Sequence, residues 1–411
     1  MQQWFLLVGA LLVAMAFGSS VVRRLPLSPA MLYLAVGFVI GPGGARWIDV
    51  DIVGDAAIIE LLAEVAVLAT LFSVGMRLRL PNHWRSWWLP LRLATLGMVL
   101  TTVLAAAAAH WVLGLPWPAA LLLAAILAPT DPVLASELQI RDPGDRDAVR
   151  LALTAEGGLN DGAAFPALML ALGLLGTHTL GTHGARWIAV DLIWSTAGGL
   201  AVGWVGGVAV AHVMRRLQGA GRPIVEVEFL VLGMIALVYG AALVLQTYGF
   251  LAVFAGGLAL GRTMQHDSAL ADGRAAGAPA GLRASVVSWT AQSERLCEVT
   301  LVLLVGMLLG RTEGTLSAVL YALVLLVAVR PLAVLLSAPT GIASHQRRLI
   351  AWFGIRGIGS LFYLAYALDH GVPAAIAPLV ADAALITIAV SITLHGVSAT
   401  PLMEWYERRR A

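Results

Sequence analysis

The sequence contains no lysine, a single cysteine and few charges of either sign. Only 12% of its 411 residues are charged, whereas a soluble domain has about 25%. The lone cysteine, Cys297, excludes an intramolecular disulfide and a cysteine-ligated metal cluster. A net charge of +2, without a basic run interleaved with aromatic residues, gives no reason to expect a nucleic-acid partner. The low share of charged residues therefore argues against an ordinary soluble protein.

The sequence is rich in hydrophobic residues. They make up 59% of the chain, and the mean hydropathy is +0.86. Apolar segments follow one another with short breaks at glycine, proline or charged clusters, and a bilayer-crossing helix needs about 20 such residues. The pattern predicts an all-α polytopic membrane protein with about thirteen transmembrane helices. They are expected near residues 4–21, 27–46, 56–76, 88–113, 116–138, 147–176, 186–214, 225–246, 249–264, 292–310, 315–337, 347–368 and 374–403.

The arginines predict an orientation. With thirteen spans and a cytoplasmic C-terminus, 20 loop arginines fall inside and only Arg46, Arg186 and Arg311 fall outside, as the positive-inside rule requires. No positive charge precedes the first segment, which favours a retained helix over a cleaved signal peptide. The sequence thus predicts a multi-pass protein of a prokaryotic plasma (inner) membrane with its N-terminus outside. Residues 265–291 are expected to form a cytoplasmic linker, with Glu294 at the solvated start of the next helix.

Polar residues interrupt the apolar span 147–176. Glu156, Asn160 and Asp161 lie in its middle. An acid at membrane depth costs roughly 2.5–3.5 kcal/mol on insertion scales, so such residues mark a functional site by default. Glu156 and Asn160 are four residues apart and share a helix face, while Asp161 lies on the neighbouring face.

Two other spans contain helix-breaking residues. Pro129 and Pro132 flank Thr130 and Asp131, and each proline removes a backbone donor in mid-span. Glycines 354, 357 and 359 flank Arg356 in the second-to-last span. Unwound backbone at membrane depth is tolerated only where it is buried in protein or lines a cavity. The alternatives are a simple proline kink capped by Asp131, and a glycine-lined packing face with a snorkelling Arg356.

The matching positions of the two breaks predict two inverted six-helix repeats with broken, crossing helices. We expect one integral membrane unit over residues 1–411, with a first repeat at 1–176, a linker helix at 186–214 and a second repeat at 225–411. Arg356 would then face the negative ends of the half-helices.

Arg330 lies in mid-span and needs an anion, and Glu156 is the unassigned one. We predict a buried Glu156–Arg330 pair that acts as scaffold. Removing one partner of a buried pair leaves an uncompensated charge, which costs about 3–5 kcal/mol.

In combination these motifs resemble the monovalent cation:proton antiporter-1 family, which includes NhaP-type bacterial antiporters and animal sodium/proton exchangers. The motifs are Thr130-Asp131-Pro132, the run from Glu156 to Gly162, Arg330, and the Gly-Ile-Arg-Gly sequence around Arg356. The resemblance covers essentially the whole chain. It implies thirteen helices, a homodimer, a structural pair at Glu156–Arg330, and an aspartate at 161 that binds a cation or a proton beside Asp131 and Thr130.

The resemblance implies a secondary antiporter that exchanges Na⁺ or Li⁺ for H⁺, with a site formed by Asp161, Asp131, Thr130 and Asn160. The Asn160-Asp161 pair favours electroneutral exchange. A K⁺/H⁺ or electrogenic antiporter remains the alternative, and a channel or sensor a further one. Gly157 stands where the family often has a serine, and either Glu60 or Glu64 is a candidate additional acid. We expect no enzyme activity and no cofactor, since no nucleophile–base constellation or phosphate loop is present.

Overall fold

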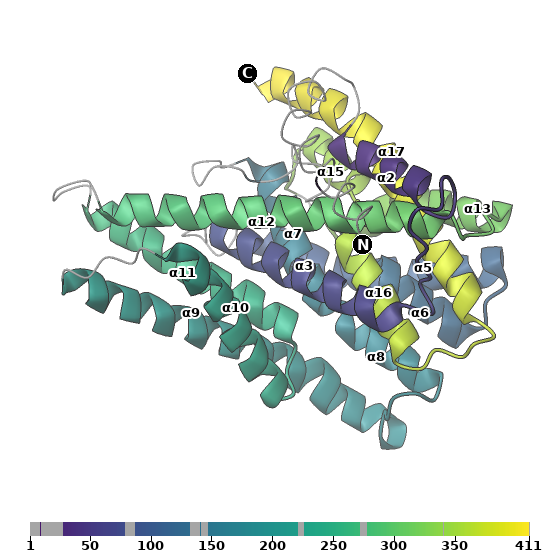
Figure 1. Cartoon of the computed structure of the whole chain (residues 1–411), viewed down its shortest axis with the longest axis horizontal. Helices are drawn as coiled ribbons and strands as arrows, with labels where there is room; N and C mark the ends of the chain where they lie inside the picture. The colour runs from purple at the N-terminus through teal and green to yellow at the C-terminus, as the bar shows by residue number, and fades with distance from the viewer. Residues whose placement is uncertain are drawn as a thin grey trace.

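The computed structural model describes residues 9, 28–78, 87–131, 140, 147–220, 226–271, 278–339 and 341–410. Within these ranges all regular secondary structure is helical (Figure 1). The expected first span, 4–21, lies outside the described residues except for Gly9. Six of the described helical segments are long and apolar enough to cross a membrane.

The other twelve expected spans each coincide with helical structure. In chain order the elements are α2 (Pro29–Ile40), α3 (Ala56–Arg77), α4 (Trp88–Arg92), η2 (Leu93–Gly97), α5 (Met98–Leu113), α6 (Trp117–Leu127), α7 (Ala148–Ala163), α8 (Phe165–Leu174), η5 (Thr182–Gly184), η6 (Trp187–Trp194) and α9 (Ser195–Gly219). They continue with α10 (Val227–Val244), α11 (Gly249–Ala271), α12 (Ala278–Leu309), α13 (Leu316–Val324), η7 (Leu325–Val329), α14 (Arg330–Ser337), α15 (Ser344–Trp352), α16 (Ile358–Asp369) and α17 (Ala377–Arg410). The all-α polytopic fold is therefore confirmed.

The prediction of a linker over residues 265–291 is wrong. Helix α11 continues to Ala271 and α12 already begins at Ala278. This stretch is rich in alanine, which has the highest helix propensity, and scattered charges do not prevent a helix from forming. With 32 residues α12 is about 48 Å long, more than a bilayer core requires.

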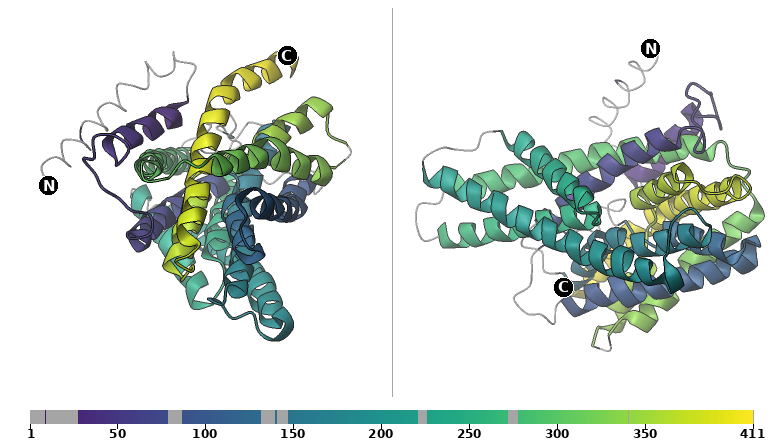
Figure 2. Two further views of the ribbon diagram at one scale, coloured as in Figure 1. Left: turned by 90° about the vertical axis from the view of Figure 1, so that its right-hand side faces the viewer. Right: turned by 90° about the horizontal axis from the view of Figure 1, so that it is seen from below.

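The helices form two neighbouring groups. Helices α3, α9, α10, α11 and α12 pack on one another, and α5, α6, α8, α13, α16 and α17 lie toward the right of Figure 1. The two groups meet where α3 packs on α16 and where α7 packs on α11. The long helix α12 runs along the molecule, and the left view of Figure 2 looks almost down its axis. Where α9 meets α11 it carries glycines, and a Cβ at Gly203 would lie 1.9 Å from the backbone oxygen of Ala252. Small residues let these helices approach closely, as is usual in membranes.

Glycines also set the packing of α7. A Cβ at Gly158 would lie 2.3 Å from the ring of Phe254, and a Cβ at Gly162 would lie 2.2 Å from Leu251. The two glycines are four residues apart, so they form one small face of α7 against α11. At its start α7 is capped by Asp147, whose side chain accepts hydrogen bonds from the backbone of Val149 and Arg150.

Both expected breaks are present. Helix α6 ends at Leu127 and residues 128–131 are not helical. Residues 353–357, between α15 and α16, are likewise not helical. The two segments meet, because the backbone N–H of Asp131 donates to the carbonyl of Ile355 at 2.8 Å. The division into two inverted repeats around a linker helix stays a prediction.

Candidate cation and proton site

Asp161 lies on α7 where that helix passes the start of α16. Its side chain is buried, and a Cβ at Gly359 would lie only 2.8 Å from its Oδ1 atom. Oδ1 has no hydrogen-bond partner within the described part of the chain. The carboxylate therefore sits against the first turn of α16, where free backbone N–H groups favour negative charge.

Asp131 joins the two broken helices. Its Oδ2 atom accepts a hydrogen bond from the backbone N–H of Ile358 at 3.1 Å. It therefore caps α16, which belongs to the other broken helix. The alternative of a kink capped by Asp131 on its own helix concerns residues 132–139, which lie outside the described residues. Asp131 also lies within electrostatic range of Asp161. Two acids thus share the start of one half-helix.

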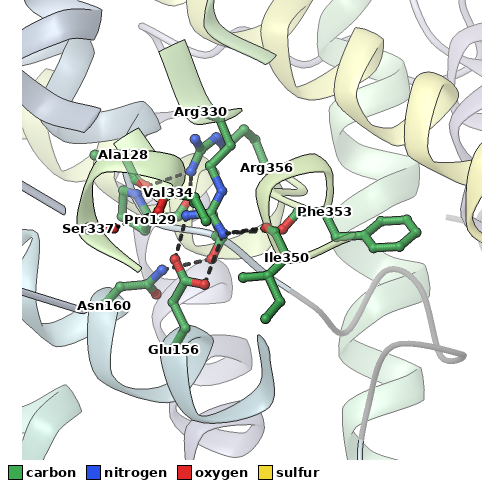
Figure 3. Close-up of polar contacts among 11 residues, drawn as sticks. Ala128, Pro129, Glu156, Asn160, Arg330, Val334, Ser337, Ile350, Phe353 and Arg356 are labelled. Carbon is green, nitrogen blue, oxygen red and sulfur yellow. Dashed lines mark hydrogen bonds and ion pairs between the residues drawn. The ribbon is translucent and has the colours of Figure 1, made fainter. Parts of the chain in front are cut away.

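Arg356 supplies positive charge on the other side of the crossing. Its Nη1 donates to the carbonyls of Ala128 and Pro129 at 2.5 and 2.8 Å (Figure 3). Its backbone N–H donates to Ser391 Oγ at 2.8 Å. Those carbonyls end α6, where the helix dipole is negative. The guanidinium is fully buried, so it is a crossing-point charge and does not snorkel to the surface.

Asn160 connects α7 to the first break. Its Nδ2 donates to Thr130 Oγ1 at 2.8 Å, while its Oδ1 has no partner among the described residues. Of the four expected site residues, Thr130 and Asn160 are in direct contact, Asp131 and Asp161 are electrostatic neighbours, and all four are buried.

Glu156 and Arg330 form the expected buried pair. Arg330 Nη1 and Nη2 donate to Glu156 Oε1 and Oε2 at 2.5 and 2.9 Å (Figure 3). Arg330 Nη2 also lies 3.3 Å from the carbonyl of Phe353, at the second break. A Cβ at Gly354 would lie 2.7 Å from the Arg330 side chain, so glycine makes room for it. The pair holds α7, α14 and the break between α15 and α16 together.

The comparisons with known proteins agree with this arrangement. A family model described as sodium/hydrogen exchanger, transmembrane, matches residues 8–405. The chain belongs to the sodium/hydrogen exchanger family. The resemblance to the monovalent cation:proton antiporter-1 family is thereby confirmed.

Several relatives of this exchanger carry NhaP names. The K⁺/H⁺ antiporter NhaP of Alkalimonas amylolytica is 28% identical over 414 residues, covering 97% of this chain and 66% of that protein. The K⁺/H⁺ antiporter NhaP2 of Shewanella sp. strain MR-4 is 27% identical, covering 96% of this chain and 66% of that protein. The chain therefore spans just under two thirds of the length of these relatives. The solved sodium proton antiporter MjNhaP1 from Methanocaldococcus jannaschii has the same fold, with a TM-score of 0.75 at 22% identity over 98% of both chains.

Neither Glu60 nor Glu64 contacts Asp161 through any described interaction. Tyr239 Oη donates to Glu64, and Glu60 Oε2 lies 3.7 Å from His370 at the end of α16. His370 is eleven residues beyond Gly359, which corresponds to about 16 Å along the helix. The two glutamates therefore lie near the far end of α16 and not at the crossing.

Aromatic rings fill the space between the crossing and those glutamates, which the sequence interpretation missed. Phe165 stacks on Tyr248 at 5.1 Å and meets Tyr363 edge-on at 5.3 Å. Phe250 meets Phe362 edge-on at 4.7 Å. The rings come from α8 and α16 on one side and from the start of α11 on the other, so they join the two helix groups. The available signal was the position of Phe165, one helical turn after Asp161.

A second buried ion pair was also missed. Arg77 and Glu294 pair between α3 and α12, and Ser73 Oγ donates to Glu294 at 2.9 Å. Glu294 is buried, so the expectation of a solvated helix start is wrong. The reason is that α12 begins 16 residues earlier, which places Glu294 in its interior against α3.

Proposed function

We propose that this exchanger carries out monovalent cation/proton antiport by alternating access, with Asp161 as the shared site. The observation that carries the proposal is a buried carboxylate with an unpartnered oxygen, placed where two broken helices cross. A lone buried charge is unfavourable, so this carboxylate favours binding a proton or a desolvated cation. The carboxylate cannot hold a proton and a cation at the same time, so the proton flux and the cation flux are coupled without a separate gate.

Sodium or lithium is the first candidate cation, because the site residues resemble those of the monovalent cation:proton antiporter-1 family. Potassium is the second candidate, because the NhaP relatives above are named K⁺/H⁺ antiporters. The donors Asp161, Asp131 and Thr130 are hard oxygen ligands that suit any of these ions.

Electroneutral exchange is supported by Asn160. Its amide binds Thr130, so the residue next to Asp161 contributes a neutral contact where a second acid would add charge. Exchange of one cation for one proton responds to no membrane voltage, whereas a net charge gains about 2.3 kcal/mol per 100 mV. An exchange rate that follows an imposed potential would contradict this part.

The membrane location, the orientation and the oligomeric state are part of the same proposal. We place the exchanger in a prokaryotic inner membrane with the N-terminus outside and the C-terminus cytoplasmic, on the arginine distribution. The family resemblance supports a homodimer.

The test uses proteoliposomes with an outward proton gradient and an internal pH dye. Pulses of Na⁺, Li⁺ or K⁺ are given to wild type and to Asp161→Asn. We expect proton efflux with at least one cation in the wild type and none in the variant, which keeps the side-chain shape without the charge. Folded wild type that responds to no cation at any pH would overturn the proposal in favour of a channel or sensor.

A further inference from the structure

The crossing contains more unsatisfied polar atoms than a packed interior normally holds. Asp161 Oδ1, Asn160 Oδ1, Ser360 Oγ and Tyr363 Oη are all buried without a hydrogen-bond partner in the described ranges. Buried polar groups are normally paired, and one left unpaired calls for an explanation such as an ion or a water molecule. Two of the four belong to α7, and the other two belong to α16.

Two hydroxyl-bearing residues of α16 follow the point where this helix touches Asp161. Gly359 is the residue of α16 that touches Asp161 Oδ1. Ser360 follows it directly, with its Cα about 3.8 Å away, and Tyr363 lies one turn further on the same face as Gly359. Both side chains are at most 1% exposed.

Tyr363 is fixed in place by its neighbours. Its ring meets Phe165 edge-on at 5.3 Å, and Phe165 lies one turn beyond Asp161 along α7 and α8. Tyr363 and Asp161 are within electrostatic range of each other. The Tyr363 side chain therefore lies near both the carboxylate and Phe165.

Ser360 lacks the partner that helical hydroxyls commonly use. Thr387 Oγ1 donates to the carbonyl of Ala383 at 2.6 Å, and Ser398 Oγ donates to that of Leu394 at 2.9 Å, each four residues earlier. Four residues before Ser360 stands Arg356, in the unwound segment, where the carbonyl is not aligned with α16. The break thus leaves the serine hydroxyl available to a ligand.

We propose that Ser360 Oγ and Tyr363 Oη are ligands of the transported cation, adding α16 to the residues that α7 and the first break contribute. The inference rests on the proposed function. Gly157 stands where the family often has a serine, and the two hydroxyls of α16 would take the place of that serine hydroxyl. Hard monovalent and divalent cations prefer oxygen ligands. Because both hydroxyls are neutral, they set affinity and ion choice without changing the number of protons exchanged.

The test compares Ser360→Ala and Tyr363→Phe with two matched controls. Ser337→Ala removes a buried serine hydroxyl that donates to its own helix at Val334, and Tyr321→Phe removes a buried, unpartnered tyrosine hydroxyl on α13. Equilibrium binding of radioactive sodium and rubidium to purified protein gives Kd, and exchange in proteoliposomes gives the cation KM.

We expect each α16 variant to raise Kd and KM by about three- to tenfold, because losing one ligand should weaken cation binding about as much as losing one hydrogen bond. The controls should change Kd and KM by no more than about twofold. Melting temperatures should not fall in Ser360→Ala and Tyr363→Phe, because each loses a hydroxyl that had no partner. Unchanged Kd in both folded variants, an equal shift in the controls, or no binding of either ion to folded wild type would overturn the ligand assignment. Binding without exchange in the wild type would instead reject the proposed function, while the Kd comparison still decides the ligands.

Discussion

Helix α7 carries two buried carboxylates five residues apart, and they differ in whether neighbouring residues hydrogen-bond to them. Both oxygens of Glu156 accept hydrogen bonds from Arg330. Asp161 has an oxygen without a partner and lies against the start of α16. Burial and residue type are nearly the same, so the difference lies in how far each charge is already satisfied. A satisfied carboxylate fixes the structure, and an unsatisfied one is available to a ligand.

The sharpest test of this comparison replaces each acid by alanine. Glu156→Ala strands the Arg330 charge, and we expect a loss of about 3–5 kcal/mol of stability and little folded protein. Asp161→Ala removes a charge without a counter-ion, so we expect unchanged or higher stability but no exchange. Thermal melting in detergent and exchange assays on the same preparations measure both. An abundant, thermally unchanged Glu156→Ala variant would refute the scaffold role.

A smaller effect is expected from Gly359→Ala. The added Cβ would lie 2.8 Å from Asp161 Oδ1, so the carboxylate has to move while the fold is kept. We expect about a tenfold lower exchange rate, or about 1.4 kcal/mol. Gly233→Ala on α10 is the control, since its Cβ would meet no atom within 4 Å. Equal rates for the two variants would show that Asp161 is not held against α16.

The smallest effect is expected at the surface. Glu407 pairs with Arg150 near the start of α7, but its side chain is 56% exposed. Exposed pairs contribute about 0–1 kcal/mol, so Glu407→Ala should melt within about one or two degrees of wild type. A drop as large as that of Glu156→Ala would show that burial is not what separates the two pairs.

Much of the fold was readable from the sequence because a membrane restricts the choice to helices of known length. Twelve of the thirteen expected spans coincide with described helices, and both breaks follow from prolines and glycines at membrane depth. The start of α12 was misplaced because an alanine-rich stretch with scattered charges can be either a linker or a helix extending beyond the bilayer. Glu294 was misjudged for the same reason.

The candidate site was only partly readable. Asp161, Asn160, Glu156 and Arg330 were found because polar residues are rare at that depth. The aromatic rings were not predicted, since aromatic side chains are common in apolar helices and only the position of Phe165, one turn after Asp161, could have pointed to them.

By itself the sequence determined the membrane class, the near-complete set of helices, and the few charges that must be paired or functional. Composition and length suffice for this, because buried charge is costly wherever it lies. Only the tertiary structure decided that Glu156 is fully paired and Asp161 is not, and that Asp131 caps α16 across the crossing. Those contacts join residues up to 227 positions apart, and no local pattern specifies them.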